Sequence, residues 1–314
     1  MIISASRRTD IPAFYSDWFI NRIRAGWCSV PNPRNYQQLS IVPLTPQEVT
    51  TIVFWSKNPE PLIKRLDELD QRGYRYYFQF TLNDYPVELE PALPPINVRV
   101  ETFKKLSERL GSLRVIWRYD PIIISNQTPM TYHLNKFSQI SESLKGYTNR
   151  VMVSFVDYYQ KTDSRLEELT KCGFEFEKKF EYNPEASILM RKLGEIAKRN
   201  GIEIFTCAEE VNFSSVGVMP GRCIDPDLIQ KIWSLKVHSR KDTTQRSLCL
   251  CTVSKDIGIN DTCLHGCTYC YATRKNITAK RRNLEHDPSS PVLWGETRPL
   301  TPSDQARLVA ARQL

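Results

Sequence analysis

Three cysteines near the end of the chain have a spacing that suits iron. Cys263, Cys267 and Cys270 form a C-x3-C-x2-C pattern, and Tyr269 directly precedes the third cysteine. Thiolates this close in sequence can converge on one face of a compact loop and bind three irons of a [4Fe–4S] cube. The fourth iron then stays open to chelate a small molecule, whereas a cluster with four cysteine ligands has no such position.

The same cysteines are also compatible with a structural zinc ion or with thiols that bind nothing. Zinc takes four nitrogen or sulfur ligands, often in paired C-x2-C spacing. His265 is the available fourth ligand. A side chain two residues from both Cys263 and Cys267 fits poorly around the same small ion, so the pattern favours the iron–sulfur cluster.

A second group of four cysteines lies in the C-terminal half of the chain: Cys207, Cys223, Cys249 and Cys251. Cys207 ends a predicted strand. Cys249 and Cys251 lie two residues apart in an extended run, so their side chains face the same side. Four thiols suit a closed zinc site or a second [4Fe–4S] cluster. The alternative is a set of buried thiols without metal, because cysteine is among the most buried residue types.

The remaining cysteines do not suggest a disulfide framework. The total of nine is odd, and the N-terminus lacks the apolar stretch of a signal peptide. We therefore interpret the isolated Cys28 and Cys172 as structural and expect a cytoplasmic protein.

Strand-like and helix-like runs alternate through the first 210 residues. The strand-like runs cover residues 2–6, 52–55, 76–81, 114–119, 150–156 and 202–206, and the helical runs cover 10–26, 61–73, 98–110, 131–146 and 185–200. Such alternation implies parallel βαβ units with right-handed crossovers. Six units predict an α/β fold with a partial (βα)6 TIM-like barrel, and a flat, doubly wound sheet is the alternative.

Two parts of the chain are expected to fold differently from these repeats. The Pro-rich connection at 27–51 predicts an extra hairpin, and Asp120-Pro121 is expected to end the fourth strand. The predicted domains are the barrel at 1–210 and a cysteine-rich, basic extension at 211–314, which we expect to bind the cluster and pack on the barrel mouth. This extension contains one further helix, expected at 303–313.

Polar residues at the carboxyl ends of the predicted strands are the candidates for binding and catalysis, because function in parallel α/β folds lies at that edge. Arg118 stands inside an apolar run and must be paired or face a polar cavity, since an unpaired buried charge is very costly. The candidate catalytic residues are Arg118, Asp120 and Asp157. The candidate cofactor-binding residues are Asn58, Ser154 and Tyr269.

The cysteine pattern with its tyrosine resembles the radical S-adenosylmethionine superfamily, and the Cys-Tyr-Ala continuation is most similar to the spore-photoproduct-lyase branch. This resemblance implies a (βα)6 barrel and a catalytic [4Fe–4S] cluster on Cys263, Cys267 and Cys270. It also implies that S-adenosylmethionine binds the open iron and yields a 5′-deoxyadenosyl radical, with flavodoxin or ferredoxin as reductant. The whole chain resembles the family of domains of unknown function numbered 1848, whose members carry a similar group of cysteines at the C-terminus.

Two features depart from the superfamily pattern. Its cysteine motif usually follows the first strand, whereas Cys263 lies 57 residues after Thr206. Its Gly-Gly-Glu-like motif after the second strand is absent, and Trp55-Ser56-Lys57-Asn58-Pro59 stands there instead. The displaced motif can still reach the barrel if residues 250–275 fold back over it.

Charge is concentrated near the C-terminus. Residues 231–314 carry 14 Lys and Arg against 7 Asp and Glu. The net charge of this segment is therefore +7, out of +8 for the whole sequence. A basic segment can recruit nucleic acid. The alternative function is therefore a non-catalytic, zinc-stabilised protein that binds nucleic acid. No stretch is long and apolar enough to predict a membrane span.

Overall fold

The computed structural model describes residues 1–310 and contains one mostly parallel sheet. Across these residues eight strands pair in the order β10-β1-β4-β5-β6-β7-β8-β9. The order advances in one direction from β1 to β9, without the reversal that defines a doubly wound sheet. This one-way order agrees with the predicted TIM-like arrangement of the strands. Within the described residues β9 and β10 are the two edges of the sheet, so the closure of a barrel stays a prediction.

The six predicted strands are confirmed: β1 (Ile2–Ala5), β4 (Thr51–Ser56), β5 (Tyr76–Thr81), β6 (Val115–Ile122), β7 (Arg150–Phe155) and β8 (Glu203–Thr206). Two short strands come from the C-terminal part of the chain, namely β9 (Met219–Pro220) and β10 (Lys255–Asp256). The expected hairpin is also present as β2 (Trp27–Asn32) and β3 (Asn35–Pro43), which pair antiparallel.

The prediction that Asp120-Pro121 ends the fourth strand is wrong. Strand β6 continues to Ile122, which pairs with Phe155 of β7 after a register shift that begins at Tyr119. Proline lacks an N–H group and is tolerated in a sheet where the ladder is interrupted by a bulge. The interruption keeps Asp120 at the polar edge of the sheet while the strand resumes beyond it.

The described chain divides into two compact units, which interleave along the sequence. The first comprises residues 1–77, 254–266 and 272–310 of the described chain, and the second comprises residues 78–253 and 267–271. These units are not the segments 1–210 and 211–314 predicted as domains, and that division stays a prediction. The C-terminal segment contributes to both units.

The first unit contains β1, β4, β10 and the hairpin. Its helices are α1 (Ile11–Phe14), α2 (Ser16–Ala25), α3 (Glu60–Ile63), α4 (Leu66–Gln71), α10 (Asn276–Leu284) and α11 (Pro302–Ala310). Asp10 caps the first helix by accepting a bond from the Ala13 N–H (3.0 Å). The single predicted helix at 10–26 is broken at Tyr15, and α2 ends at the left-handed Gly26. The last residues of the helix expected at 303–313 lie outside the described residues.

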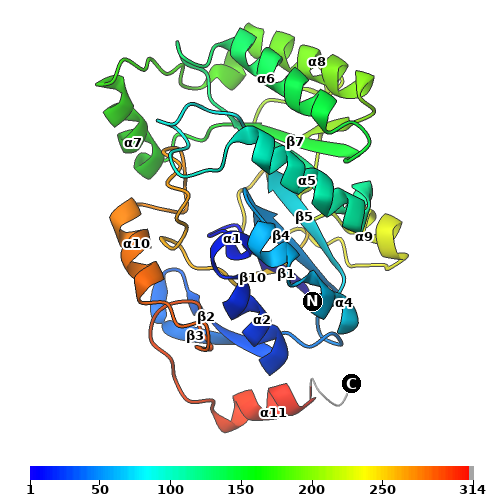
Figure 1. The fold of residues 1–314 in the computed structure, drawn as a ribbon, viewed down its shortest axis with the longest axis vertical. Helices are drawn as coiled ribbons and strands as arrows, with labels where there is room; N and C mark the ends of the chain where they lie inside the picture. The colour runs from blue at the N-terminus through cyan, green and yellow to red at the C-terminus, as the bar shows by residue number, and fades with distance from the viewer. Residues whose placement is uncertain (311–314) are drawn as a thin grey trace. The chain divides into compact units, whose positions relative to one another are not determined.

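The second unit contains most of β5 and all of β6 to β9. Its helices are α5 (Ile96–Leu110), α6 (Met130–Ser143), α7 (Gln160–Thr170), α8 (Pro184–Arg199) and α9 (Pro226–Trp233), with short 3-10 turns at Ser112–Arg114, Phe180–Tyr182 and Ser214–Val216. Helices α6 and α8 lie side by side (Figure 1). Stacking of Trp117 on Phe137 at 4.6 Å between ring centroids packs α6 on the sheet.

Candidate functional site

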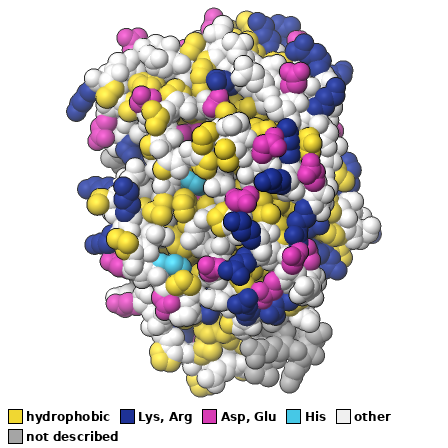
Figure 2. Space-filling view, in the orientation of Figure 1, with side chains coloured by type: hydrophobic (Ala, Val, Ile, Leu, Met, Phe, Trp, Pro, Cys, Tyr) yellow, Lys and Arg dark blue, Asp and Glu magenta, His cyan; other side chains and the backbone are white. Residues whose placement is uncertain are grey.

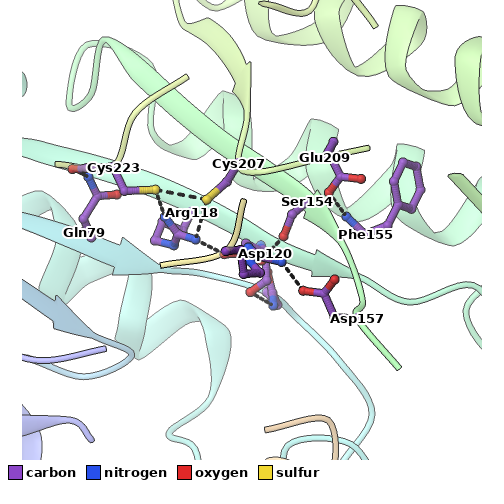
Figure 3. A network of polar contacts seen from close by, with 11 residues as sticks. Gln79, Arg118, Asp120, Ser154, Phe155, Asp157, Cys207, Glu209 and Cys223 are labelled. Carbon is purple, nitrogen blue, oxygen red and sulfur yellow. Dashed lines mark hydrogen bonds and ion pairs between the residues drawn. The ribbon is translucent and has the colours of Figure 1, made fainter. Parts of the chain in front are cut away.

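A buried network of polar side chains lies around Arg118 of β6 in the second unit (Figure 3). The guanidinium donates to the Asp120 carboxylate and to the Cys223 sulfur at 2.7 Å, and its second nitrogen lies 3.8 Å from the Cys207 sulfur. Burial alone would lower the pKa of Arg118, but Asp120 and the two sulfurs raise it well above its ordinary value. The sequence expectation that this arginine is paired is therefore confirmed.

Asp120 is held from several sides. Its carboxylate accepts a bond from the Ser154 hydroxyl, and its backbone N–H donates to Asn83 Oδ1 at 3.1 Å. Burial acts to raise the pKa of Asp120, and Arg118 overcomes this effect and lowers the pKa below its ordinary value. Asp120 is therefore an ionised carboxylate beside a cation, with fixed orientation.

Two further carboxyl groups follow β7 and β8. Asp157 pairs with Arg246, and Glu209 accepts a bond from the Phe155 N–H at 2.8 Å. Burial raises the pKa of Glu209 to about 8. Burial also raises the pKa of Asp157, although Arg246 acts in the opposite direction. A carboxyl group with a pKa close to neutral can hold or release a proton under ordinary conditions.

The second group of cysteines converges next to this network. The Cys207 and Cys223 sulfurs are 3.2 Å apart, Cys223 contacts Cys251, and Cys251 contacts Cys249. All four cysteines are buried, and none of the nine cysteines forms a disulfide. The hydrogen bond between the first two thiols lowers the pKa of Cys207 to about 7 and raises that of Cys223.

The C-x3-C-x2-C loop is anchored in each unit separately. In the second unit Thr268 donates from its N–H to the Leu89 carbonyl at 3.1 Å, and the Tyr269 hydroxyl donates to Glu90. Tyr269, expected to bind the cofactor, is thus buried with its phenol engaged by a carboxylate. Cys270 donates from its N–H to the Cys267 carbonyl at 3.1 Å, which makes a tight turn between the last two cysteines.

In the first unit the loop is fixed by a histidine–aspartate pair. His265 Nε2 lies 2.7 Å from Asp10 Oδ2, and both side chains are buried. His265 Nδ1 is also buried and has no hydrogen-bond partner in the described structure. The Tyr15 hydroxyl donates to the Thr262 carbonyl at 2.6 Å and holds the residue before Cys263.

The structure thus brings together some of the predicted site residues in the second unit. Arg118, Asp120, Ser154 and the four cysteines form one network, and Asp157 joins it through Arg246. Asn58 belongs to the first unit, where its N–H donates to Ser56 Oγ at 3.0 Å. No group of three or more His, Cys, Asp and Glu in the described chain is arranged to hold a metal ion as it stands.

Three members of the network were not among the candidate site residues chosen from the sequence. Glu209 and Asn83 follow β8 and β5, so the strand-end rule that selected Asp157 also applies to them. Arg246 lies in a loop within the basic segment, and only its ion pair distinguishes it from its neighbours. Figure 2 shows Lys and Arg interspersed with Asp and Glu on the visible face, which is the distribution expected when many charges form pairs such as Arg246 with Asp157.

Fold and site together define an α/β protein with a mostly parallel sheet and two groups of cysteines outside disulfides. The model of the family described as "Domain of unknown function (DUF1848)" matches residues 2–272, and the chain belongs to this family. The matched residues include all nine cysteines. A comparison with curated proteins gives no match. Within the described residues, no helix is long and apolar enough to cross a membrane.

Proposed function

We propose that this protein is a radical S-adenosylmethionine enzyme whose [4Fe–4S] cluster is held by Cys263, Cys267 and Cys270. When bound and reduced, by a protein such as flavodoxin or ferredoxin, the cluster supplies the electron that cleaves S-adenosylmethionine to methionine and a 5′-deoxyadenosyl radical. The substrate is a molecule from which that radical removes hydrogen. The chain's own residues must position the three thiols and bind that substrate.

The observation that carries this proposal is the place of β10 in the sheet. β10 pairs parallel with β1, with Ile3 opposite Lys255 and Ser4 opposite Asp256. Parallel neighbours have their carboxyl ends at the same edge of a sheet. The cysteine loop that follows β10 therefore begins at the edge where β1 ends, which is where the superfamily places its motif. This place of β10 supports the proposal despite the late position of the motif in the sequence.

Specific contacts join the chain after β10 to the chain after β1. Ile257 donates from its N–H to the Ser4 carbonyl at 3.1 Å, and Asp256 accepts a bond from the Ser6 hydroxyl at 2.7 Å. Gly258 passes so close that a Cβ atom there would lie 2.0 Å from the Ser6 hydroxyl oxygen. Only glycine fits at this crossing, which indicates that the two segments are shaped to each other.

The three thiols of the cysteine motif also suit a [4Fe–4S] cluster. Cys263, Cys267 and Cys270 are within eight residues of one another and none forms a disulfide. Cys267 is buried and the other two are partly buried, so the loop is neither fully exposed nor inaccessible. Three thiols from one loop leave the fourth iron for the amino and carboxylate groups of S-adenosylmethionine, as the superfamily resemblance implies.

For substrate binding we propose the polar edge of the second unit. Arg118 and Asp120 present a fixed ion pair, and Glu209 supplies a carboxyl group that holds a proton near neutral pH. Such groups can orient a polar substrate and exchange a proton with it. Asp157 and Arg246 complete this edge.

The test is anaerobic reconstitution of the full chain followed by reduction with dithionite. We expect a brown protein with about four irons per chain in the cluster that releases 5′-deoxyadenosine and methionine from S-adenosylmethionine. Cys267→Ala should abolish this release, and Cys28→Ser serves as the matched control because its thiol is buried elsewhere. A colourless protein that binds zinc after reconstitution refutes the proposal.

One contact favours the second candidate, a zinc-stabilised protein that binds nucleic acid. A histidine that ligates zinc commonly places its other nitrogen on a carboxylate, and His265 has this arrangement with Asp10. A Cys3His zinc site would then use the buried Nδ1 atom. This candidate requires zinc that is lost in both Cys267→Ala and His265→Ala, together with a salt-sensitive gel shift.

A further inference from the structure

The second group of cysteines is drawn from three separate segments of the second unit. Cys207 follows β8, Cys223 lies between β9 and α9, and Cys249 and Cys251 lie in the connection before β10. Their sulfurs touch in series, from Cys207 to Cys223, then Cys251, then Cys249. Burial of isolated thiols explains where each residue lies but not why four of them meet.

Donors are directed at these sulfurs. Arg118 donates to the Cys223 sulfur at 2.7 Å, and the Ile224 N–H donates to the Cys251 sulfur at 3.3 Å. Neutral thiols are weak acceptors, whereas thiolates bound to a metal are normally held by hydrogen bonds of this kind. A buried cation beside several sulfurs also suits a group that carries negative charge.

We propose that one zinc ion is bound here through four thiolates, those of Cys207, Cys223, Cys249 and Cys251. Binding displaces one proton from each thiol, and the resulting site with two negative charges is partly offset by the Arg118 guanidinium. The ion ties the end of β8 to the loop after β9 and to the segment 249–251. The role is structural, because four protein ligands leave zinc no open position.

The spacing of the sulfurs distinguishes a single ion from a cluster. Zn–S bonds of about 2.3 Å in a tetrahedron place the sulfurs about 3.8 Å apart. The Cys207 and Cys223 sulfurs are 3.2 Å apart, which is close to this separation, and zinc binding requires the row of four thiols to close around the ion. A cubane keeps its cysteine sulfurs much further apart, because the iron–sulfide cube lies between them.

Disulfide chemistry accounts less well for the group. Cys207 and Cys223 could be oxidised to a disulfide by an external oxidant. Cys249 and Cys251, however, are separated by a single residue. A bridge across one residue is strained, since disulfide geometry demands a specific separation of the two Cα atoms. A metal uses all four thiols in one site.

The test measures zinc and iron in the full chain, purified anaerobically without added metal, by elemental analysis. We expect one zinc per chain in the wild type and in Cys267→Ala, where the catalytic cluster is absent. This makes the result independent of the proposed function. Cys223→Ser and Cys249→Ser should lower the zinc content by at least about tenfold. Cys28→Ser and Cys172→Ser are the matched controls and should leave it unchanged.

A second measurement covers variants that fail to fold. Cys267→Ala expressed with cobalt in place of zinc should show the visible absorption of tetrahedral cobalt with sulfur-to-metal charge transfer from four thiolates. A chelator should bleach this absorption and lower the unfolding midpoint. The proposal is overturned by a chain without zinc or cobalt, by iron with sulfide at this position in Cys267→Ala, or by a disulfide between Cys207 and Cys223.

Discussion

Asp256 is the residue through which the pairing of β10 with β1 can be tested most directly. Its carboxylate accepts four hydrogen bonds, from Ser4 Oγ (2.9 Å), Ser6 Oγ (2.7 Å), the Arg7 N–H (2.8 Å) and the Gly258 N–H (2.9 Å). Asp256→Ala removes all four at once. The two serine side chains are buried, so their hydroxyls would lose this acceptor without access to water.

The expected effect follows from the value of hydrogen bonds to a charged group. Each such bond contributes about 1.5–3 kcal/mol when it is buried. Because Asp256 itself is only partly buried, water replaces some of this bonding. We therefore expect Asp256→Ala to lower the free energy of unfolding by about 3 kcal/mol. Asp256→Asn keeps one oxygen acceptor and should lose roughly half as much.

The assay is urea unfolding of the reduced chain, followed by circular dichroism, together with iron content after anaerobic reconstitution. Glu195→Ala is the matched carboxylate control, since this side chain is 61% exposed and pairs with Arg191 one turn away. It should change stability by less than about 0.5 kcal/mol. Asp256→Ala should also retain less iron, because the cysteine loop begins at this residue.

The two readouts refute different statements. If Asp256→Ala changes stability by less than about 1 kcal/mol, these bonds do not hold β10 against β1. If stability falls but iron and 5′-deoxyadenosine release stay at wild-type values, this pairing does not position the cluster loop. The second result leaves the strand pairing intact and removes its link to the proposed function.

Three further outcomes are expected. Arg118→Met should lower the free energy of unfolding in urea by about 3–5 kcal/mol, and the added change Asp120→Asn should recover part of this loss. If the effects of the two changes simply add, Arg118 and Asp120 are not a buried ion pair. Burial lowers the pKa of His133 from 6.5 to about 4. The contribution of its neutral ring to the free energy of unfolding is therefore complete above pH 6.5, and about 3 kcal/mol of it is lost as the pH falls to 4. Urea midpoints of the wild type and His133→Gln should therefore converge over that range, and parallel curves would show that His133 is not responsible. Tyr269→Phe should destabilise the chain by about 1–3 kcal/mol by depriving buried Glu90 of a donor, with Tyr271→Phe as a nearby control that should have no such effect.

Much of the fold could be predicted because its longer elements have strong local patterns. The six longer strands of the sheet are short runs made mostly of apolar residues, and α5 and α8 have regular apolar faces that end near glycine. β9 and β10 have two residues each and no pattern of their own. α7 was missed because only Thr162 and Leu166 are buried along its length, so its polar face hides the helical period.

The candidate site could be predicted in type but not in detail. The rule that a buried arginine needs a partner predicted the pairing of Arg118, and the strand-end rule selected Asp120 and Ser154, which contact each other. The partners Cys223 and Arg246 come from loops whose path depends on tertiary packing. No local pattern in the sequence indicates that Cys223 would lie 2.7 Å from the guanidinium.

Under the proposed function, the position of a strand in the sheet matters more than its position in the chain. The proposed cluster loop leaves the carboxyl edge of the sheet beside the first strand, and a parallel strand paired outside β1 offers this position as well as β1 itself. The loop after β1 contacts the segment that contains the cysteine motif, through the Arg8 contact to the Gly258 carbonyl (3.4 Å) and the pairing of Asp10 with His265. On this proposal the segment with the thiols starts from the same edge of the sheet, although the thiols lie some 250 residues after the first strand in the chain. It follows that the residues to compare with a motif after the first strand are those after Asp256, and that Ser4 and Ser6, which bind this aspartate, should tolerate substitution less well than their size suggests.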